Sequence, residues 1–572
     1  MLMKKARLAA LAIAAATAFG GAAHAGSLAG AYLAGKHAAA NTDVAAAAKY
    51  YASALRRDQD NVRLMEQALI YLAAAGRVDE AIEVAERLEQ AEPAHRMAAL
   101  MLTAEMFRVG DFEAARARVE ADPGAYHPLV GAMLGGWAAF GLGDEAAAAA
   151  SFDGLEDRPI FRIFSGYHKG LMLHAAGDPA AAAEAFRTAA GEVTTPTGRI
   201  ARAYAAALGA SGDIEGARGI LEGALEAAVG EANVERDIAG LDQTPPTPAE
   251  PLVKTPADGA AEALYGLAAA LGRDGEDRLS LFYTRVATHL RPSFDDAALL
   301  TAELLSAQDQ QRLAIKAYEA IPPSSPLSRS GEIGRAEALH ELEEDARAVE
   351  ALRNLTRREP EALEAHVALG DLLRRTERFD EAAEAYDAAV KLMEAADRPN
   401  WVLYYQRGIA YERSDQWPKA EADFFRALEL RDDQPLVLNY LGYSWLEMGV
   451  NLDRALDMIR KAVSQRPDDG YIVDSLGWAH YLLNDFPAAV RELERAVELR
   501  PIDPVINDHL GDALWRVGRK REAEFQWRRA LSFDPEKDEV KRIRRKIAVG
   551  LDVVLAEEAT SEDGESKTAD DG

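Results

Sequence analysis

The C-terminal third of the chain reads LNYLGYSWLEMGVNLDRALDMIRKAVSQRP at 438–467, VDSLGWAHYLLNDFPAAVRELERAVELRP at 473–501 and NDHLGDALWRVGRKREAEFQWRRALSFDP at 507–535. Each segment has a Gly, a small residue one helix further on, a large apolar residue four later, an Ala three after that, and a closing Pro. The positions are Gly442, Gly477 and Gly511; Ala455, Ala489 and Ala523; Ile459, Leu493 and Trp527; Ala462, Ala496 and Ala530; and Pro467, Pro501 and Pro535. The glycines are 35 and 34 residues apart. This period predicts an array of helical hairpins.

The spacing has a packing reason. Two helices cross closely only where one presents a small residue, and a bulky residue one turn along fills the groove beside it. The closing Pro cannot continue a helix, so it ends one hairpin and opens the next. Because no hairpin buries its apolar face alone, the hairpins are expected to stack into a solenoid.

The same repeat continues through most of the chain. Apolar residues at helical spacing, together with abundant Ala, Leu, Glu and Arg, favour helices throughout. The period predicts an all-α solenoid of about fourteen hairpins. The small residues that mark the hairpins upstream are Ala47, Ala81, Ala115, Ala148, Ala182, Ala217, Ala314, Ala348, Ala382 and Ala420.

The repeat phase breaks in a segment with five prolines at 240–259, and two shorter interruptions follow at 321–331 and 394–400. A segment so rich in Pro cannot be a helix, so it is predicted to be a linker between an N-terminal array at 26–239 and a C-terminal array at 260–549. The C-terminal array should end in a capping helix, and the acidic residues 550–572 should form a disordered tail. The basic capping helix either docks the tail or an anionic surface, or simply faces water. Its basic residues are Lys537, Lys541, Arg542, Arg544, Arg545 and Lys546.

By these residues the chain resembles the tetratricopeptide repeat (TPR) family over nearly its whole length after residue 25. The resemblance implies a right-handed superhelix that binds protein or peptide partners. The motifs LNYLGY, DSLGWAHY and DHLGDALW are similar to those of bacterial cell-envelope TPR scaffolds, including a group that serves carboxyl-terminal processing proteases. That group usually carries a lipid-modified cysteine, whereas this chain has no Cys.

The N-terminus has the layout of a secretory signal peptide. Lys4, Lys5 and Arg7 precede an apolar run at 8–19, and Ala23-His24-Ala25 is a small-x-small cleavage site. Cleavage after Ala25 would yield an exported protein, periplasmic in a Gram-negative source, without a stable membrane span. An uncleaved anchor is the alternative, although the apolar run is short for a membrane span.

Charge and motifs exclude several classes of function. The formal net charge of −29 argues against a nucleic-acid partner, since phosphate contacts rely on Lys and Arg. The sequence shows no catalytic constellation, no metal-binding spacing and no cofactor fingerprint; His340-Glu341 lacks the second His of a zinc-protease helix. We therefore expect no catalytic residue, metal or cofactor, although a site assembled across repeats would leave no local motif.

The first helix of each hairpin is expected to line a concave groove. The exposed positions of the last four hairpins are aromatic and acidic. The acidic positions favour a basic or neutral polypeptide. The aromatic positions favour recognition, because Tyr and Trp dominate binding hot spots. For each aromatic residue, packing between hairpins is the alternative. Asn439 alone matches the groove residues with which TPR proteins hold a carboxylate, and Asp474 and Asp508 would repel one. The predicted partner-binding residues are Tyr405, Asn439, Tyr443, Tyr471, Asp474, Trp478, Tyr481, Asp508, Asp512 and Trp515.

Two classes of function follow. The favoured one is a non-catalytic scaffold or adaptor of the cell envelope that holds a polypeptide, for example an envelope protease or its substrates. The alternative is a TPR subunit of an envelope polysaccharide or export apparatus, or an enzyme whose site spans several repeats.

Overall fold

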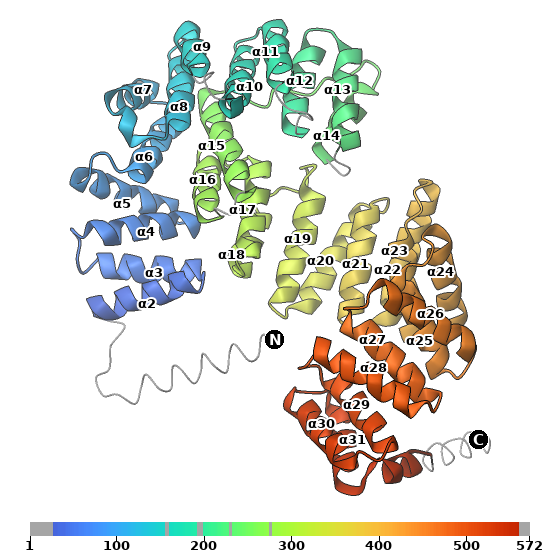
Figure 1. The fold of residues 1–572 in the computed structure, drawn as a ribbon. Coiled ribbons are helices and arrows are strands. Elements are labelled where there is room, and N and C mark those ends of the chain that lie inside the picture. Colours follow the sequence, from blue (N-terminus) through green and yellow to red (C-terminus); the bar gives the residue numbers. More distant parts are fainter. Residues whose placement is uncertain (1–26, 155–158, 192–197, 228–231, 274–276, 560–572) are drawn as a thin grey trace. The chain divides into compact units, whose positions relative to one another are not determined.

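The computed structural model describes residues 27–154, 159–191, 198–227, 232–273 and 277–559 (Figure 1). Within these ranges the chain is built from α-helices joined by short turns, with one 3-10 turn and no strand, which confirms the all-α prediction. The predicted signal peptide at 1–25 and the last part of the acidic tail lie outside the described residues. The chain divides into two compact units, residues 1–355 and 356–572.

The first unit contains consecutive hairpins and one short 3-10 turn. Its elements are α2 (Leu28–Ala40), α3 (Val44–Leu55), α4 (Val62–Ala74), α5 (Val78–Ala91), α6 (Arg96–Val109), α7 (Phe112–Ala121), η1 (Pro123–Ala125), α8 (Pro128–Gly141), α9 (Glu145–Asp153), α10 (Pro159–Ala175), α11 (Pro179–Gly191), α12 (Gly198–Ala210), α13 (Ile214–Ala227), α14 (Ala232–Leu241), α15 (Pro256–Arg273), α16 (Asp277–Leu290), α17 (Asp295–Ala307), α18 (Gln311–Tyr318) and α19 (Ser328–Glu341).

The second unit continues the hairpins to the C-terminal end of the described residues. Helix α20 (Asp345–Arg358) runs across the boundary between the units. The remaining helices are α21 (Leu363–Arg375), α22 (Phe379–Ala395), α23 (Trp401–Arg413), α24 (Trp417–Leu430), α25 (Pro435–Glu447), α26 (Leu452–Gln465), α27 (Gly470–Leu482), α28 (Phe486–Leu499), α29 (Pro504–Arg516), α30 (Lys520–Ser532) and α31 (Lys537–Val549).

The hairpins pack through the small and large residues that define the repeat. A Cβ built on Gly477 would lie 2.5 Å from Cγ of Leu493, and one built on Gly511 would lie 2.4 Å from Cδ1 of Trp527. The crossing alanines, Ala489 among them, are fully buried. A larger residue at these glycines would force the two helices apart, so the small positions of the pattern are contact points between helices.

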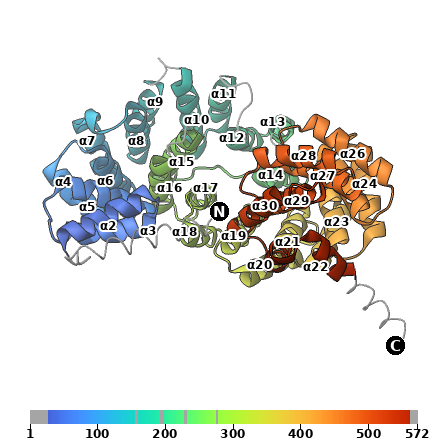
Figure 2. The same ribbon diagram turned by 60° about the horizontal axis from the view of Figure 1, so that its bottom comes forward.

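Local signals explain where the helices start and turn. Carboxylates at N-cap positions accept hydrogen bonds from the first free backbone N–H groups; Asp503 Oδ1, for example, accepts from Ile506 N at 3.0 Å. Many turns between paired helices contain a residue with positive φ, such as Gly110 with φ of 80°. These features fix hairpins of similar length, which stack on their neighbours in the second view of the molecule (Figure 2).

Residues 242–255 of the Pro-rich segment are non-helical, whereas α15 already begins at Pro256, and the segment lies inside the first unit and not between the two units. The backbone N–H of Thr247 donates to Gly240 O at 2.9 Å, and Arg291 donates to Leu252 O at 2.8 Å. Beyond it, α15 packs on α6 and α8, and α16 packs on α4 and α6 (Figure 1). The helices on both sides of the segment share one core, so the compact unit extends to residue 355.

The capping helix does not end at a disordered tail at residue 550. Helix resumes over residues 551–559, beyond a break at Gly550, whose φ is 90°. Arg542 and Arg545 of α31 pair with Glu558 and Glu557 at 2.8 and 2.6 Å. The basic helix therefore docks the first part of the acidic segment, and residues 560–572 lie outside the described part of the chain.

Candidate partner-binding surface

The predicted partner-binding residues lie on the first helices of four consecutive hairpins. Tyr405 is on α23; Asn439 and Tyr443 are on α25; Tyr471, Asp474, Trp478 and Tyr481 are on α27; and Asp508, Asp512 and Trp515 are on α29. We call these ten residues the first-helix set. The structure separates them into an aromatic stack, an acidic site that is already occupied, and a few side chains that stand apart.

Trp478 is the centre of the aromatic stack. Its ring lies parallel to that of Tyr481, with centroids 4.6 Å apart, and to that of His509, with centroids 4.0 Å apart. Its Nε1 donates to Glu447 Oε1 at 2.8 Å, so a polar contact from α25 holds the indole in place. Stacking between adjacent hairpins accounts for part of this aromatic content, because α27 contributes Trp478 and α29 contributes His509.

His509 is a member of the surface that the sequence reasoning missed. Its Nδ1 lies 3.1 Å from both carboxylate oxygens of Asp474. Burial alone would lower the pKa of His509, but the carboxylates of Asp474, Asp508 and Asp512 outweigh burial and raise the pKa above its ordinary value. The available signal was position: His509 follows Asp474 by 35 residues, which is one repeat, and so lies on the adjacent first helix.

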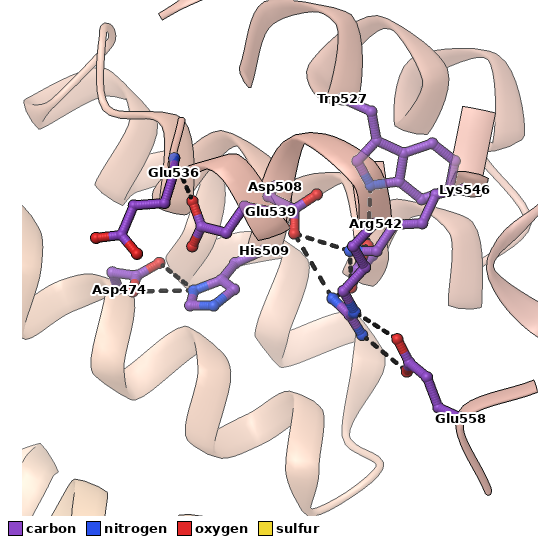
Figure 3. A network of polar contacts seen from close by, with 10 residues as sticks. Asp474, Asp508, His509, Trp527, Glu536, Glu539, Arg542, Lys546 and Glu558 are labelled. Atoms are coloured by element: carbon purple, nitrogen blue, oxygen red, sulfur yellow. Dashed lines mark hydrogen bonds and ion pairs between the residues drawn. The ribbon is translucent and has the colours of Figure 1, made fainter. Parts of the chain in front are cut away.

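The acidic part of the set has an occupant from the same chain. Lys546 of α31 places its Nζ 2.8 Å from Asp508 Oδ2 and 2.7 Å from Asp512 Oδ2 (Figure 3). Trp527 Nε1 also donates to Asp512 Oδ1 at 2.9 Å. Burial is the main cause that raises the pKa of Asp512 to about 6; Asp508 adds to the rise, and Lys546 opposes it.

This arrangement differs from the exposed acidic groove that the sequence predicted. Asp474, Tyr481 and Asp512 are buried, because α27 and α29 pack closely and α31 covers α29. Arg542 adds a second cation, with its NH1 3.7 Å from Asp512 Oδ2. A basic partner would therefore have to displace the capping helix to reach Asp508 and Asp512.

Trp515 is likewise covered by the end of the chain. Its Nε1 donates to Asp552 Oδ2 at 3.0 Å, and its ring lies 5.4 Å from that of Trp527. A Cβ built on Gly550 would lie 2.5 Å from the Trp515 ring, so glycine is required where the chain passes the indole. Packing is thus the observed role of Trp515.

Two members of the set stand apart from the stack. Tyr471 is 53 % exposed, and the guanidinium of Arg500 lies 4.9 Å from its ring centroid. Tyr405 packs in an aromatic cluster, with its ring 6.0 Å from that of Tyr440 and 6.2 Å from that of Phe424. Tyr405 therefore contributes to packing between α23, α24 and α25.

Asn439 and Tyr443 lie one turn apart on α25. Among the described residues, none donates a hydrogen bond to Asn439 Oδ1, although that atom is buried. Tyr443 is mostly buried; burial raises the pKa of its phenol, and Glu447 and Asp474 raise it further. An acceptor that is buried without a donor is costly, by about 1–3 kcal/mol, so Asn439 stands out on this surface.

The described residues contain no group of three or more His, Cys, Asp or Glu side chains that could hold a metal ion. In the same part of the chain, no helix combines the length and the apolar character needed to span a bilayer.

Comparison with known proteins supports the repeat assignment. The tetratricopeptide repeat family model matches residues 32–96 and 334–399. These matches and the observed hairpins show that the chain carries tetratricopeptide repeats and folds as a TPR solenoid. Proteins of this class generally mediate protein–protein interactions, and their repeats generally act as non-catalytic scaffolds.

Individual relatives match only parts of the chain. A TPR repeat-containing protein of Pseudomonas aeruginosa is 31% identical over 19% of this chain and 18% of its own length. The aspartyl/asparaginyl beta-hydroxylase of Mus musculus is 25% identical over 40% of this chain and 28% of its own length. A tetratricopeptide repeat protein structure from Parabacteroides merdae is 14% identical, with a TM-score of 0.39, and covers 44% of this chain and 98% of its own. The chain thus spans less than a third of the length of these two curated relatives.

Proposed function

We propose that this protein is a non-catalytic adaptor of the cell envelope that holds a polypeptide segment on α25 and α27, beside Asn439, Tyr443 and Trp478. The observation that carries the proposal is the buried Asn439 Oδ1, which accepts no hydrogen bond from any described residue. On this proposal the side chains that cover the atom move aside on binding, and a backbone N–H of the polypeptide donates to it, since an extended segment presents such groups along its length.

The neighbouring side chains suit a polypeptide. Trp478 and Tyr443 are partly exposed and held in place, because Glu447 hydrogen-bonds the indole and lies against the phenol. Aromatic side chains held in place lose little conformational entropy on binding, which is why they often dominate affinity. The proposed site ends before Asp508 and Asp512, since Lys546 already neutralises that pair.

The location of the adaptor is proposed from its N-terminal sequence. Three basic residues, an apolar run and Ala23-His24-Ala25 are typical of an exported protein. On this proposal the partner is an envelope polypeptide, such as a processing protease or its substrate. N-terminal sequencing of the protein purified from its source would test export: a chain starting at Gly26 in the periplasmic fraction supports it, and an intact Met1 in the cytosol contradicts it.

Capture of the partner tests the adaptor role. The mature chain would be used to retrieve partners from a periplasmic extract, followed by mass spectrometry and by affinity measurement with the retrieved polypeptide. We expect Asn439→Leu and Trp478→Ala to weaken that affinity by at least tenfold while circular dichroism shows an intact fold.

A matched control is Phe525→Ala on α30, since Phe525 is 60 % exposed on the second helix of its hairpin. We expect it to leave affinity unchanged. If Phe525→Ala abolishes capture while Asn439→Leu and Trp478→Ala do not, the partner binds elsewhere and the proposal is wrong.

A further inference from the structure

The first unit contains an apolar pocket that lies outside the surface described above. Its volume is about 400 Å³, and it opens where α15 and α16 pack against α6 and α8. Phe164 and Phe282 belong to its lining together with aliphatic residues such as Leu100 and Leu267. Ligand pockets for small molecules are of this size and are lined mainly by apolar and aromatic side chains.

The pocket exists because the helices after the Pro-rich segment fold back onto the earlier hairpins. Phe282 and Leu100 are buried, so two walls of the pocket are part of the core. Tyr126 forms part of the lining, and its hydroxyl lies 2.6 Å from Thr103 Oγ1, which fixes its ring. Fixed walls indicate a cavity that is formed before any ligand arrives.

Three hydrogen-bond donors share this apolar lining. Arg96 is the first residue of α6, and no described residue forms a salt bridge with it, although the chain as a whole is strongly acidic. His127 caps α8: its Nδ1 accepts from Leu129 N at 3.4 Å, which leaves Nε2 as the protonated nitrogen. The third donor is the phenol of Tyr283. Burial raises its pKa above the ordinary value, and Arg96 only partly opposes this rise.

We propose that this pocket binds a small amphiphile with an acyl chain or similar apolar body and a carboxylate head. The apolar lining would take the body. The unpaired guanidinium of Arg96 would take the carboxylate, with His127 Nε2 and the Tyr283 hydroxyl as further donors. The positive charge of Arg96 would repel a cationic head, and a neutral head would make only a weaker hydrogen bond than a carboxylate, because it lacks the opposite charge.

Isothermal titration of the full chain with dodecanoate, below its micellar concentration, tests the proposal. We expect saturable binding at one site, and binding of dodecyltrimethylammonium weaker by at least tenfold. Equal affinity for the two head groups, or no saturable binding of dodecanoate, would overturn the proposal. Tighter binding of a peptide with a C-terminal Leu than of dodecanoate at this pocket would also overturn the proposal.

Variants locate the site. Arg96→Gln should weaken dodecanoate binding by about tenfold, because a charge-assisted hydrogen bond is lost. The matched control is Arg63→Gln, an exposed position in the first turn of α4 outside the pocket, and it should leave binding unchanged. Ala270→Trp, at an exposed position of the lining, should narrow the opening and abolish binding with circular dichroism unchanged.

These variants test the amphiphile site independently of the adaptor proposal. Equal loss in Arg96→Gln and Arg63→Gln would show a general charge effect and overturn the assignment. If Ala270→Trp fails to fold, the Arg96→Gln and Arg63→Gln pair still tests it, since both residues are exposed. Asn439→Leu in the second unit should bind dodecanoate normally, so failure of one proposal does not carry over to the other.

Discussion

Lys546 Nζ lies 2.7 Å from both carboxylate oxygens of Asp512, and neither side chain is more than 1 % exposed. The two residues are 34 positions apart, which is one repeat, and they join the capping helix to the last complete hairpin. A buried ion pair of this kind is costly to break from one side, because the remaining charge loses its partner without regaining water.

Replacing Lys546 by Met should destabilise the last hairpin strongly. The change leaves the buried carboxylate of Asp512 facing Asp508 without the ammonium between them, and breaking a buried pair in this way costs about 3–5 kcal/mol. Chemical denaturation and hydrogen exchange would measure the loss, which we expect to be greatest in α29, α30 and α31. Lys541→Met is the control, since Lys541 is exposed and pairs only at the surface with Asp538. Equal stability of the two variants would contradict the buried role of Lys546.

The pair of His509 and Asp474 should make stability depend on pH. The folded-state pKa of His509 is raised above its unfolded value, so the folded state binds a proton more tightly. Its contribution is fully present below the unfolded pKa of about 6.5 and is lost as pH rises through the folded pKa. His509→Gln should flatten this part of the profile of melting temperature against pH. His480→Gln is a suitable control because burial lowers the pKa of His480, which gives the opposite sign.

Ala489 tests the packing of the repeats. Its side chain is fully buried in α28, so Ala489→Leu should overpack the crossing of α27 and α28 and cost about 1–3 kcal/mol. Thermal unfolding would measure this. Ala422→Leu is the matched control at an exposed position of α24 and should leave the melting temperature nearly unchanged. An unaltered melting temperature for Ala489→Leu would show that the repeat phase is misplaced.

Proteolytic cleavage in the Pro-rich segment should leave the two resulting fragments bound to each other. Lys254 is exposed, so limiting trypsin should cleave after it. Because α15 and α16 pack on α4, α6 and α8, the products should remain associated in size-exclusion chromatography and separate only in denaturant. Lys254→Gln should remove this cut. Fragments that separate without denaturant would instead support a true linker.

Much of the fold was predictable because it depends on short, repeated spacing. Gly477 and Leu493 lie within one hairpin, and their contact follows from helix geometry alone. The return of α15 and α16 onto earlier hairpins was not predictable, since the Pro-rich segment before them looks like any exposed linker. Contacts between distant hairpins depend on the path of the whole unit, and that path leaves no local pattern in the sequence.

The candidate surface was predicted less well than the fold. The aromatic positions Trp478 and Tyr481 were correctly placed on a first helix, but their exposure depends on what covers them. Lys546 neutralises Asp512 from α31, a helix that lies outside the two-helix repeat pattern. One signal was available: Lys546 stands one repeat after Asp512, so opposite charges matched across that interval would have indicated the contact.

Because α31 lies one period beyond α29, it stands where the first helix of another hairpin would begin, with Lys546 as its contact to the preceding repeat. In this place α31 neutralises Asp512 and covers α29, and the short helical stretch at 551–559 packs against α31. Another helix can pack on this face of α29 only if Lys546 first leaves its buried pair. The contact that stabilises the last repeat therefore also closes this face of α29 to further stacking.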